Sequence, residues 1–122
     1  MAGTLLIPTT VAQAVAARRD QPQARVIAGG TDIVADLNRG VAATGFVALR
    51  AVDELRGVQI QQGQWRIGAM ATVADVRANT DLAAATTALG QATRSLGSRQ
   101  IRNQATVGGN VCGGGPQRTL IP

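Results

Sequence analysis

The sequence predicts an α+β fold built from two parts of different style. Residues 4 to 50 alternate short apolar runs with helical patterns, in the order strand, helix, strand, helix, strand. Such alternation is typical of a small sheet with parallel crossover connections. The later residues change to one hairpin followed by helices. We therefore expect a βαβαβ subdomain at residues 1–55 and a second subdomain, with antiparallel strands and helices, at residues 56–122.

The first subdomain alternates three strands with two helices. Buried strands are expected at residues 4–8, 24–28 and 45–50. The first helix should follow Thr9 or Thr10, because a hydroxyl side chain can accept a hydrogen bond from the first free amides of a helix. The second helix, at residues 31–39, is expected to have Thr31 as its N-cap and Gly40 as the residue that stops it.

The second subdomain is expected to open with a hairpin around Gly63. Val58 and Ile60 alternate with glutamines, which predicts a strand with one apolar and one wet face. A short helix at residues 72–79 should follow, with Thr72 as N-cap and Asp75 completing a capping box.

The remainder of the second subdomain is read as one long helix and a return to extended chain. The helix at residues 81–96 should be capped by Thr80 or Asp81 and end near Gly97. Residues 98–110 then read as an extended segment that ends in a glycine turn, and a further helix is expected to begin at Pro116.

Composition excludes several classes of protein. The 122 residues carry a formal net charge of +5, with twelve arginines, no lysine, no histidine and one cysteine, Cys112. Without histidine there is no His-based catalytic triad or His metal site, and one thiol cannot hold an iron–sulfur cluster. We therefore expect no catalytic residue and no metal bound directly by this chain. No apolar run is long enough to span a membrane and no signal peptide is recognisable, so a cytoplasmic location is expected.

The positive charge does not predict binding to nucleic acid. The arginines are spread along the chain, and only Arg18 and Arg19 are adjacent. Aromatic residues make up 2% of the sequence, so no side chains alternate with the arginines to stack on bases. We expect no nucleic-acid partner.

Two glycine pairs stand after apolar runs, at Gly29-Gly30 and at Gly108-Gly109. Glycine lets backbone N–H groups approach a ligand closely, and the helix expected after Gly30 adds about half a positive charge at its start. Together these features favour an anion such as phosphate, and two such loops could bind a pyrophosphate from both sides. The other interpretation of each pair is a tight turn that binds nothing. A P-loop is excluded because the sequence has no GK[ST] motif.

Several polar residues near these loops have two interpretations. Asp32 can satisfy the amides of the first helical turn or accept a hydrogen bond from a ribose or ribityl hydroxyl. Arg99 and Arg102 can neutralise a phosphate or be solvated. Cys112 can be a reactive thiol or a small packing residue. Thr72 can be a helix cap alone or also line a ligand cleft.

Three segments together resemble a known family. They are "AGGTDIVADLNRG" (28–40), "WRIGAMATVADV" (65–76) and "IRNQATVGGNVCGGGP" (101–116). Their order and spacing are similar to those of the FAD-binding subunit or domain of molybdenum hydroxylases, the family of xanthine dehydrogenase and carbon monoxide dehydrogenase medium subunits. The resemblance covers essentially the whole chain. It implies a two-subdomain FAD-binding fold with the flavin between the subdomains.

The resemblance also implies which residues bind FAD. The first group would contact the phosphates and nearby hydroxyls, and comprises Ile27, Ala28, Gly29, Gly30, Thr31, Asp32 and Ile33. The second group would form the other contact loop, and comprises Thr106, Gly108, Gly109 and Asn110. Thr72 would line the cofactor cleft. The chain departs from the family pattern at Thr119, which stands where the family often has an aspartate near the flavin.

Partners are implied by the same resemblance. Substrate would be oxidised at a molybdenum cofactor on one partner chain, and electrons would pass through two [2Fe–2S] clusters on another to this FAD and a final acceptor. The alternatives are a stand-alone flavoprotein of the same superfamily and a non-catalytic scaffold. The second subdomain reads as incomplete at its C-terminus, and exposed apolar faces are expected on its helices.

Overall fold

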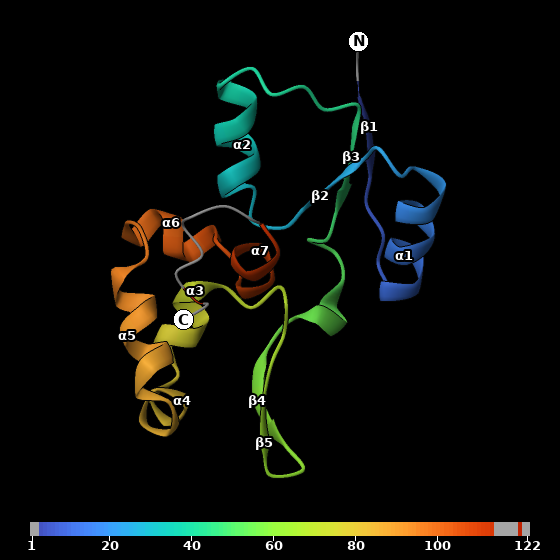
Figure 1. Cartoon of the computed structure of the whole chain (residues 1–122). Helices are drawn as coiled ribbons and strands as arrows, with labels where there is room; N and C mark the ends of the chain where they lie inside the picture. Colours follow the sequence, from blue (N-terminus) through green and yellow to red (C-terminus); the bar gives the residue numbers. More distant parts are fainter. Residues whose placement is uncertain (1–2, 114–119, 121–122) are drawn as a thin grey trace.

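The computed structural model describes residues 3–113 and residue 120, and a three-stranded parallel sheet forms its first part (Figure 1). The strands are β1 (Thr4–Leu6), β2 (Arg25–Ile27) and β3 (Gly45–Ala48). Their spatial order is β1-β3-β2, so the chain crosses over the position of β3 and then returns to it. This reversal places helix α1 (Val11–Asp20) and helix α2 (Thr31–Asn38) on opposite sides of the sheet in Figure 1.

The predicted βαβαβ order of the first part is confirmed, but its burial is lower than expected. Thr10 caps α1 by accepting a hydrogen bond from the amide of Gln13. β2 is not a buried strand, because Val26 is 45% exposed. β3 lies in the middle of the sheet and is mostly buried. A strand at the edge of a three-stranded sheet lacks a neighbour on one side, so only the central strand becomes core.

The start of α2 differs from the prediction. The N-cap is Gly30, in the left-handed conformation with φ 78° and ψ 0°, and Thr31 is the first helical residue. Gly30 therefore supplies no side-chain cap to this helix. The sequence favoured Thr31 because hydroxyl residues lead the N-cap preference, but a left-handed backbone at this position favours glycine. The predicted stop at Gly40 is confirmed by its φ of 83° directly after the C-cap Arg39.

A 3₁₀ turn (Asp53–Leu55) connects the sheet to an antiparallel hairpin of β4 (Val58–Gln61) and β5 (Gln64–Ile67). The predicted turn is confirmed: Gln62 and Gly63 both have positive φ, 51° and 73°. The apolar face of this hairpin is less buried than expected, because Ile60, which pairs with Trp65, is 62% exposed. In Figure 1 the tip of this hairpin extends away from the rest of the described chain.

The second part then consists of short helices rather than one long one. Helix α3 (Val73–Ala78) begins with the predicted capping box of Thr72 and Asp75. The single helix predicted at 81–96 is wrong: it is divided into α4 (Thr80–Ala85) and α5 (Thr87–Ser95), and Asn79 rather than Thr80 or Asp81 caps the first. The break falls at Thr86, whose φ is −137° and whose hydroxyl donates to the carbonyl of Leu82. A side chain that competes for helix carbonyls favours such a break.

The segment predicted as extended is mostly helical. Helix α6 (Arg99–Gln104) begins after Ser98, and helix α7 (Val107–Cys112) contains both glycines of the second pair. Extended backbone remains only between them, where Thr106 forms a bridge with Thr72. A core cluster of this part packs Val73, Leu96 and Ala105 together, and Val73 and Ala105 are sequence neighbours of the two bridged threonines. Within the described part of the chain, no helix has the length and apolarity needed to cross a membrane.

Candidate functional site

The first glycine pair forms a short loop between β2 and α2. The left-handed backbone of Gly30 turns the chain from strand into helix, above the side chain of Ile27. Across residues 3–113 and 120, the backbone amides from Gly29 to Ile33 have no hydrogen-bond acceptor. Unpaired amides at a helix start, together with the positive end of the helix dipole, are suited to an anion.

The amides of the second glycine pair are already paired within the protein. Val107 donates to the carbonyl of Ala71, and Gly108 donates to the carbonyl of Ala69, each at 2.9 Å. The amide of Gly109 donates to the hydroxyl of Thr106 at 3.0 Å. The second pair therefore begins a helix whose first amides bind protein groups.

Close backbone packing explains why glycine stands at Gly108. A Cβ at this position would lie 2.8 Å from the Cβ of Ala69 and 2.9 Å from its carbonyl oxygen. The contact, together with the bridge between Thr72 and Thr106, fixes the start of α7 against the segment that precedes α3. Thr106 is only 3% exposed as a result.

The two glycine pairs, 79 positions apart, meet in the folded chain. A Cβ on Gly29 would lie only 1.9 Å from the carbonyl oxygen of Gln104, four residues before the second glycine pair. A Cβ on Gly109 would lie 4.0 Å from the Cβ of Ala28. The carboxylate of Asp32 lies beside the end of α7, where its Oδ2 is 3.2 Å from the Cβ position of Gly113. Figure 1 shows α7 lying just below the start of α2.

The expected site residues are therefore gathered into one region, with different environments. Asp32 is exposed, Thr31 is half-buried and Ile33 is 9% exposed. Thr72 caps α3, and the side-chain oxygen of Asn110 accepts a hydrogen bond from the amide of Leu120 at 3.1 Å. Their roles in binding FAD stay predictions.

The other polar residues singled out in the sequence lie as follows. Arg102 donates to the carbonyls of Leu96 and Gly97, so it fixes the turn before α6. Arg99 and the Cys112 thiol are exposed. Thr119 and the helix start at Pro116 lie outside the described residues. Among the residues that are described, no three or more His, Cys, Asp or Glu side chains form a group able to hold a metal ion.

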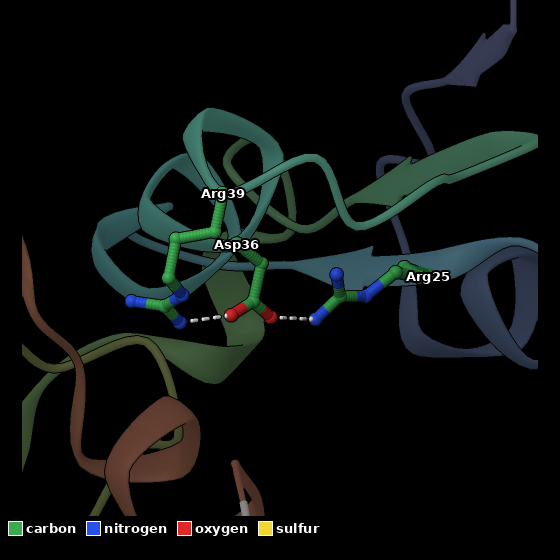
Figure 2. A network of polar contacts seen from close by, with 3 residues as sticks. All are labelled: Arg25, Asp36 and Arg39. Carbon is green, nitrogen blue, oxygen red and sulfur yellow. Dashed lines mark hydrogen bonds and ion pairs between the residues drawn. The ribbon is translucent and has the colours of Figure 1, made fainter.

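Several backbone contacts and one ion-pair network were not predicted from the sequence. The site is shaped by backbone atoms of Ala69, Ala71 and Gln104. Backbone atoms are the same in every residue type, so the sequence does not indicate these contacts. Figure 2 shows the network, in which the carboxylate of Asp36 binds Arg25 at 2.8 Å and Arg39 at 2.5 Å. The Arg39 contact is three residues away on the helix and could have been found from spacing, whereas the Arg25 contact depends on how α2 folds back along β2.

This network affects the protonation of Asp36. The hydrogen bond from Arg25 is the largest cause that holds the pKa of the Asp36 carboxyl below its usual value of 3.8, and the hydrogen bond from Arg39 acts in the same direction. Partial burial opposes the change but does not reverse it. Asp36 is therefore a carboxylate at neutral pH and holds both guanidinium groups.

The whole chain, residues 1–122, matches the family described as the FAD-binding domain in molybdopterin dehydrogenase. The chain belongs to this family. The family expected from the three sequence motifs is confirmed, as is the α+β fold class. FAD is accordingly the cofactor that this family of domains binds.

Similar proteins carry the same cofactor in their names. The xanthine dehydrogenase FAD-binding subunit of Escherichia coli O157:H7 is 36% identical over 107 residues, which cover 86% of this chain and 37% of the relative. The nicotinate dehydrogenase FAD-subunit of Eubacterium barkeri is 33% identical over 94 residues, which cover 76% of this chain and 31% of that subunit. The chain thus spans about a third of the length of these relatives.

Solved structures show the same fold. A chain of the Cu,Mo-CO dehydrogenase in its cyanide-inactivated form is similar with a TM-score of 0.86 and 28% identity, covering 93% of this chain and 41% of that one. Quinoline 2-oxidoreductase from Pseudomonas putida 86 is similar with a TM-score of 0.82 and 28% identity, covering 91% of this chain and 39% of that one.

Proposed function

We propose that this chain binds FAD as part of a molybdenum hydroxylase-type oxidoreductase, with the flavin pyrophosphate held at the loop of residues 28–33. The observation that carries the proposal is the row of amides from Gly29 to Ile33, which have no acceptor among the described residues and lie in a loop packed on the junction of α6 and α7. A pyrophosphate carries negative charge and several acceptor oxygens, which match these amides and the helix dipole. The residues present therefore fit the phosphate part of the cofactor.

The second glycine pair, in α7, is not proposed to bind the pyrophosphate through its backbone amides. Because Val107, Gly108 and Gly109 use their amides within the protein, α7 acts as a wall beside the loop rather than as a second row of donors. Gly29 packs on Gln104 at the end of α6, and Gly109 of α7 lies beside Ala28, so the junction of α6 and α7 borders the site. Asn110 and Thr72 would contact the cofactor from this wall, and Asp32 would accept a hydrogen bond from a hydroxyl of the ribose or ribityl chain.

FAD, when bound, supplies the redox chemistry by accepting electrons and passing them on, while the protein binds and orients it. In the proposed enzyme, an iron–sulfur subunit delivers the electrons and a subunit with the molybdenum cofactor oxidises the substrate. The names of the similar xanthine and nicotinate dehydrogenase subunits support this assignment. The division of the chain into FAD-binding subdomains at residues 1–55 and 56–122 is part of the same proposal.

Binding of FAD and of riboflavin tests the role of the loop. Riboflavin has the same ring system but no phosphate, so we expect FAD to bind at least about a hundredfold more tightly, as the loss of two charge-assisted hydrogen bonds predicts. Quenching of flavin fluorescence gives both dissociation constants. Equal affinities for the two flavins would contradict a pyrophosphate site at residues 28–33.

The proposed partners need a separate measurement. The protein, purified from its source under native conditions, should carry iron, sulfide and molybdenum in associated chains, and its flavin should be reduced when substrate is added. A flavin-containing protein that purifies alone and is reduced directly by a substrate would favour a stand-alone flavoprotein instead.

A further inference from the structure

A side-chain bridge spans the loop proposed to hold the flavin phosphates. Arg25 is the first residue of β2, and Asp36 lies in the second turn of α2, eleven positions later. The Nη2 atom of Arg25 donates to Oδ2 of Asp36 at 2.8 Å, and Arg39 contacts the other carboxylate oxygen (Figure 2). The strand before the loop and the helix after it are thus joined by side chains as well as by the loop itself.

The start of α2 has few hydrogen bonds among the described residues. Gly30 offers no side chain to cap the helix, and the amides from Gly29 to Ile33 have no acceptor in the described part of the chain. Few local bonds therefore fix the angle between β2 and α2. The bridge from Arg25 to Asp36 supplies one bond directly between these two elements.

The environment of the bridge makes it more than a surface ion pair. The side chains of Arg25 and Asp36 are 33% and 24% exposed. Arg25 has a second nitrogen, Nη1, that is buried and has no hydrogen-bond partner among the described residues. Without the carboxylate, this partly buried guanidinium would have to move toward water, because an unpaired buried charge is unfavourable. Since Arg25 and Arg39 occupy both oxygens of Asp36, the carboxylate also has little freedom to rotate.

We propose that the Arg25–Asp36 bridge is a positioning pair, which holds the amides of residues 29–33 in the arrangement that receives the flavin pyrophosphate. The inference rests on the proposed function of this loop. Neither side chain touches the cofactor in this proposal. They act through the angle between β2 and α2, which sets where the loop amides point.

The first measurement is amide hydrogen exchange in the flavin-free protein. Asp36→Asn and Arg25→Gln each remove the ionic bridge, while Arg25→Lys keeps a positive charge there. We expect exchange of the Val34 amide, which donates to the carbonyl of Gly30 at 2.9 Å, to become about tenfold faster in the first two variants, and to change less than threefold in Arg25→Lys. Exchange at Val107 and Gly108 should be unchanged in all three, because their acceptors belong to residues 69–71.

The second measurement is the dissociation constant of FAD, with Asp53→Asn as the matched control. Asp53 forms an ion pair with Arg56 at 3.6 Å, outside the glycine loop. We expect about tenfold weaker FAD binding in Asp36→Asn and Arg25→Gln, near wild-type binding in Arg25→Lys, and no change in the control. Thermal unfolding of each variant separates loss of the loop geometry from loss of the fold.

The outcomes separate this proposal from the one on which it rests. Wild-type protein that does not bind FAD would contradict the proposed function, and amide exchange would still decide whether the bridge orders the loop. Unchanged exchange of the Val34 amide in Asp36→Asn would overturn the positioning role. So would FAD binding that is weakened equally by Asp53→Asn, or that is unaffected by loss of Asp36 while the fold stays intact.

Discussion

The two glycine pairs of this chain look alike in the sequence and differ in the structure. Gly29-Gly30 follows a strand, turns through a left-handed residue and leaves a row of backbone amides without acceptors in the described chain. Gly108-Gly109 lies inside the first turn of a helix, and both of its amides are bound to protein oxygens. Both pairs pack closely, Gly29 on Gln104 and Gly108 on Ala69. They differ in their amides, which lack acceptors in the described chain at the first pair and bind protein oxygens at the second.

The two glycine pairs differ in what they can offer a pyrophosphate. A pyrophosphate held symmetrically between two glycine loops would need free amides on both sides. Within residues 3–113 and 120, free amides lie on one side, and the other side supplies a helix beside the loop, with Gly109 close to Ala28. One pair would bind the anion and the other would shape the space beside it.

The largest expected effect comes from Gly30→Val. A branched side chain is strongly disfavoured at a φ of 78°, so the loop should leave this conformation and turn its amides away from the ligand. Losing two charge-assisted hydrogen bonds would weaken FAD binding by about 3 kcal/mol or more, at least a hundredfold. Titration of flavin fluorescence measures this.

Gly30→Asn is the matched control for that variant. Asparagine adopts left-handed backbone far more readily than valine does, so it should keep most of the FAD affinity. Equal losses in the two variants would show that the side chain itself, rather than the backbone conformation, obstructs the ligand.

The next effect is expected from Gly29→Ala, and it is on stability. The added Cβ would lie 1.9 Å from the carbonyl oxygen of Gln104, so the loop and the junction of α6 with α7 must separate. Overpacking of this severity costs about 3 kcal/mol of unfolding free energy. Chemical denaturation of the flavin-free protein should show the loss. A variant as stable as the wild type would mean that the two glycine pairs are not packed together in solution.

Much of the fold could be predicted from local patterns, because local physics decides those features. The βαβαβ order follows from apolar periodicity, the turn at Gly63 from its position between two alternating runs, and the capping box from Thr72 and Asp75 at the required spacing. Each of these depends on residues close in sequence.

The features that the sequence did not predict depend on distant contacts. The helical state of Gly108-Gly109 is fixed by carbonyls of residues 69–71, since glycine alone disfavours a helix interior. The break at Thr86 is an exception, because its hydroxyl donates to the carbonyl of Leu82 only four residues earlier. The two glycine pairs lie near each other in the structure, but the difference between them depends on which amides find acceptors, and residue type does not indicate this.

Acid should weaken the Arg25–Asp36 bridge that spans the first glycine pair, and should leave the hydrogen bonds of the second pair unchanged. The pKa of Asp36 is lowered in the folded protein by Arg25 and Arg39, so its contribution to stability is fully present above its usual pKa of 3.8. That contribution is lost as the pH falls through the lowered pKa of the folded state. The amides of Val107, Gly108 and Gly109 bind uncharged oxygens and have no such dependence.

Acid unfolding of Asp36→Asn measures this effect. The variant should be less stable than the wild type at pH 6, and the difference should shrink as the pH falls below 3.8. Asp53→Asn is again the control. A difference between wild type and Asp36→Asn that persists at the lowest pH would show that the carboxylate charge is not what stabilises this region.

The smallest effect is expected from Gly109→Ala, and it tests the comparison most directly. The new Cβ would meet the Thr106 hydroxyl at 2.9 Å, while alanine favours the helix by up to about 1 kcal/mol over glycine. These opposing contributions should leave stability within about 1 kcal/mol of the wild type. Because the Gly109 amide already binds Thr106, FAD affinity should fall less than about tenfold, which is 1.4 kcal/mol. A hundredfold loss of FAD affinity at unchanged stability would instead show that the second glycine pair contacts the cofactor as closely as the first, with the Gly109 amide released from Thr106 when FAD binds.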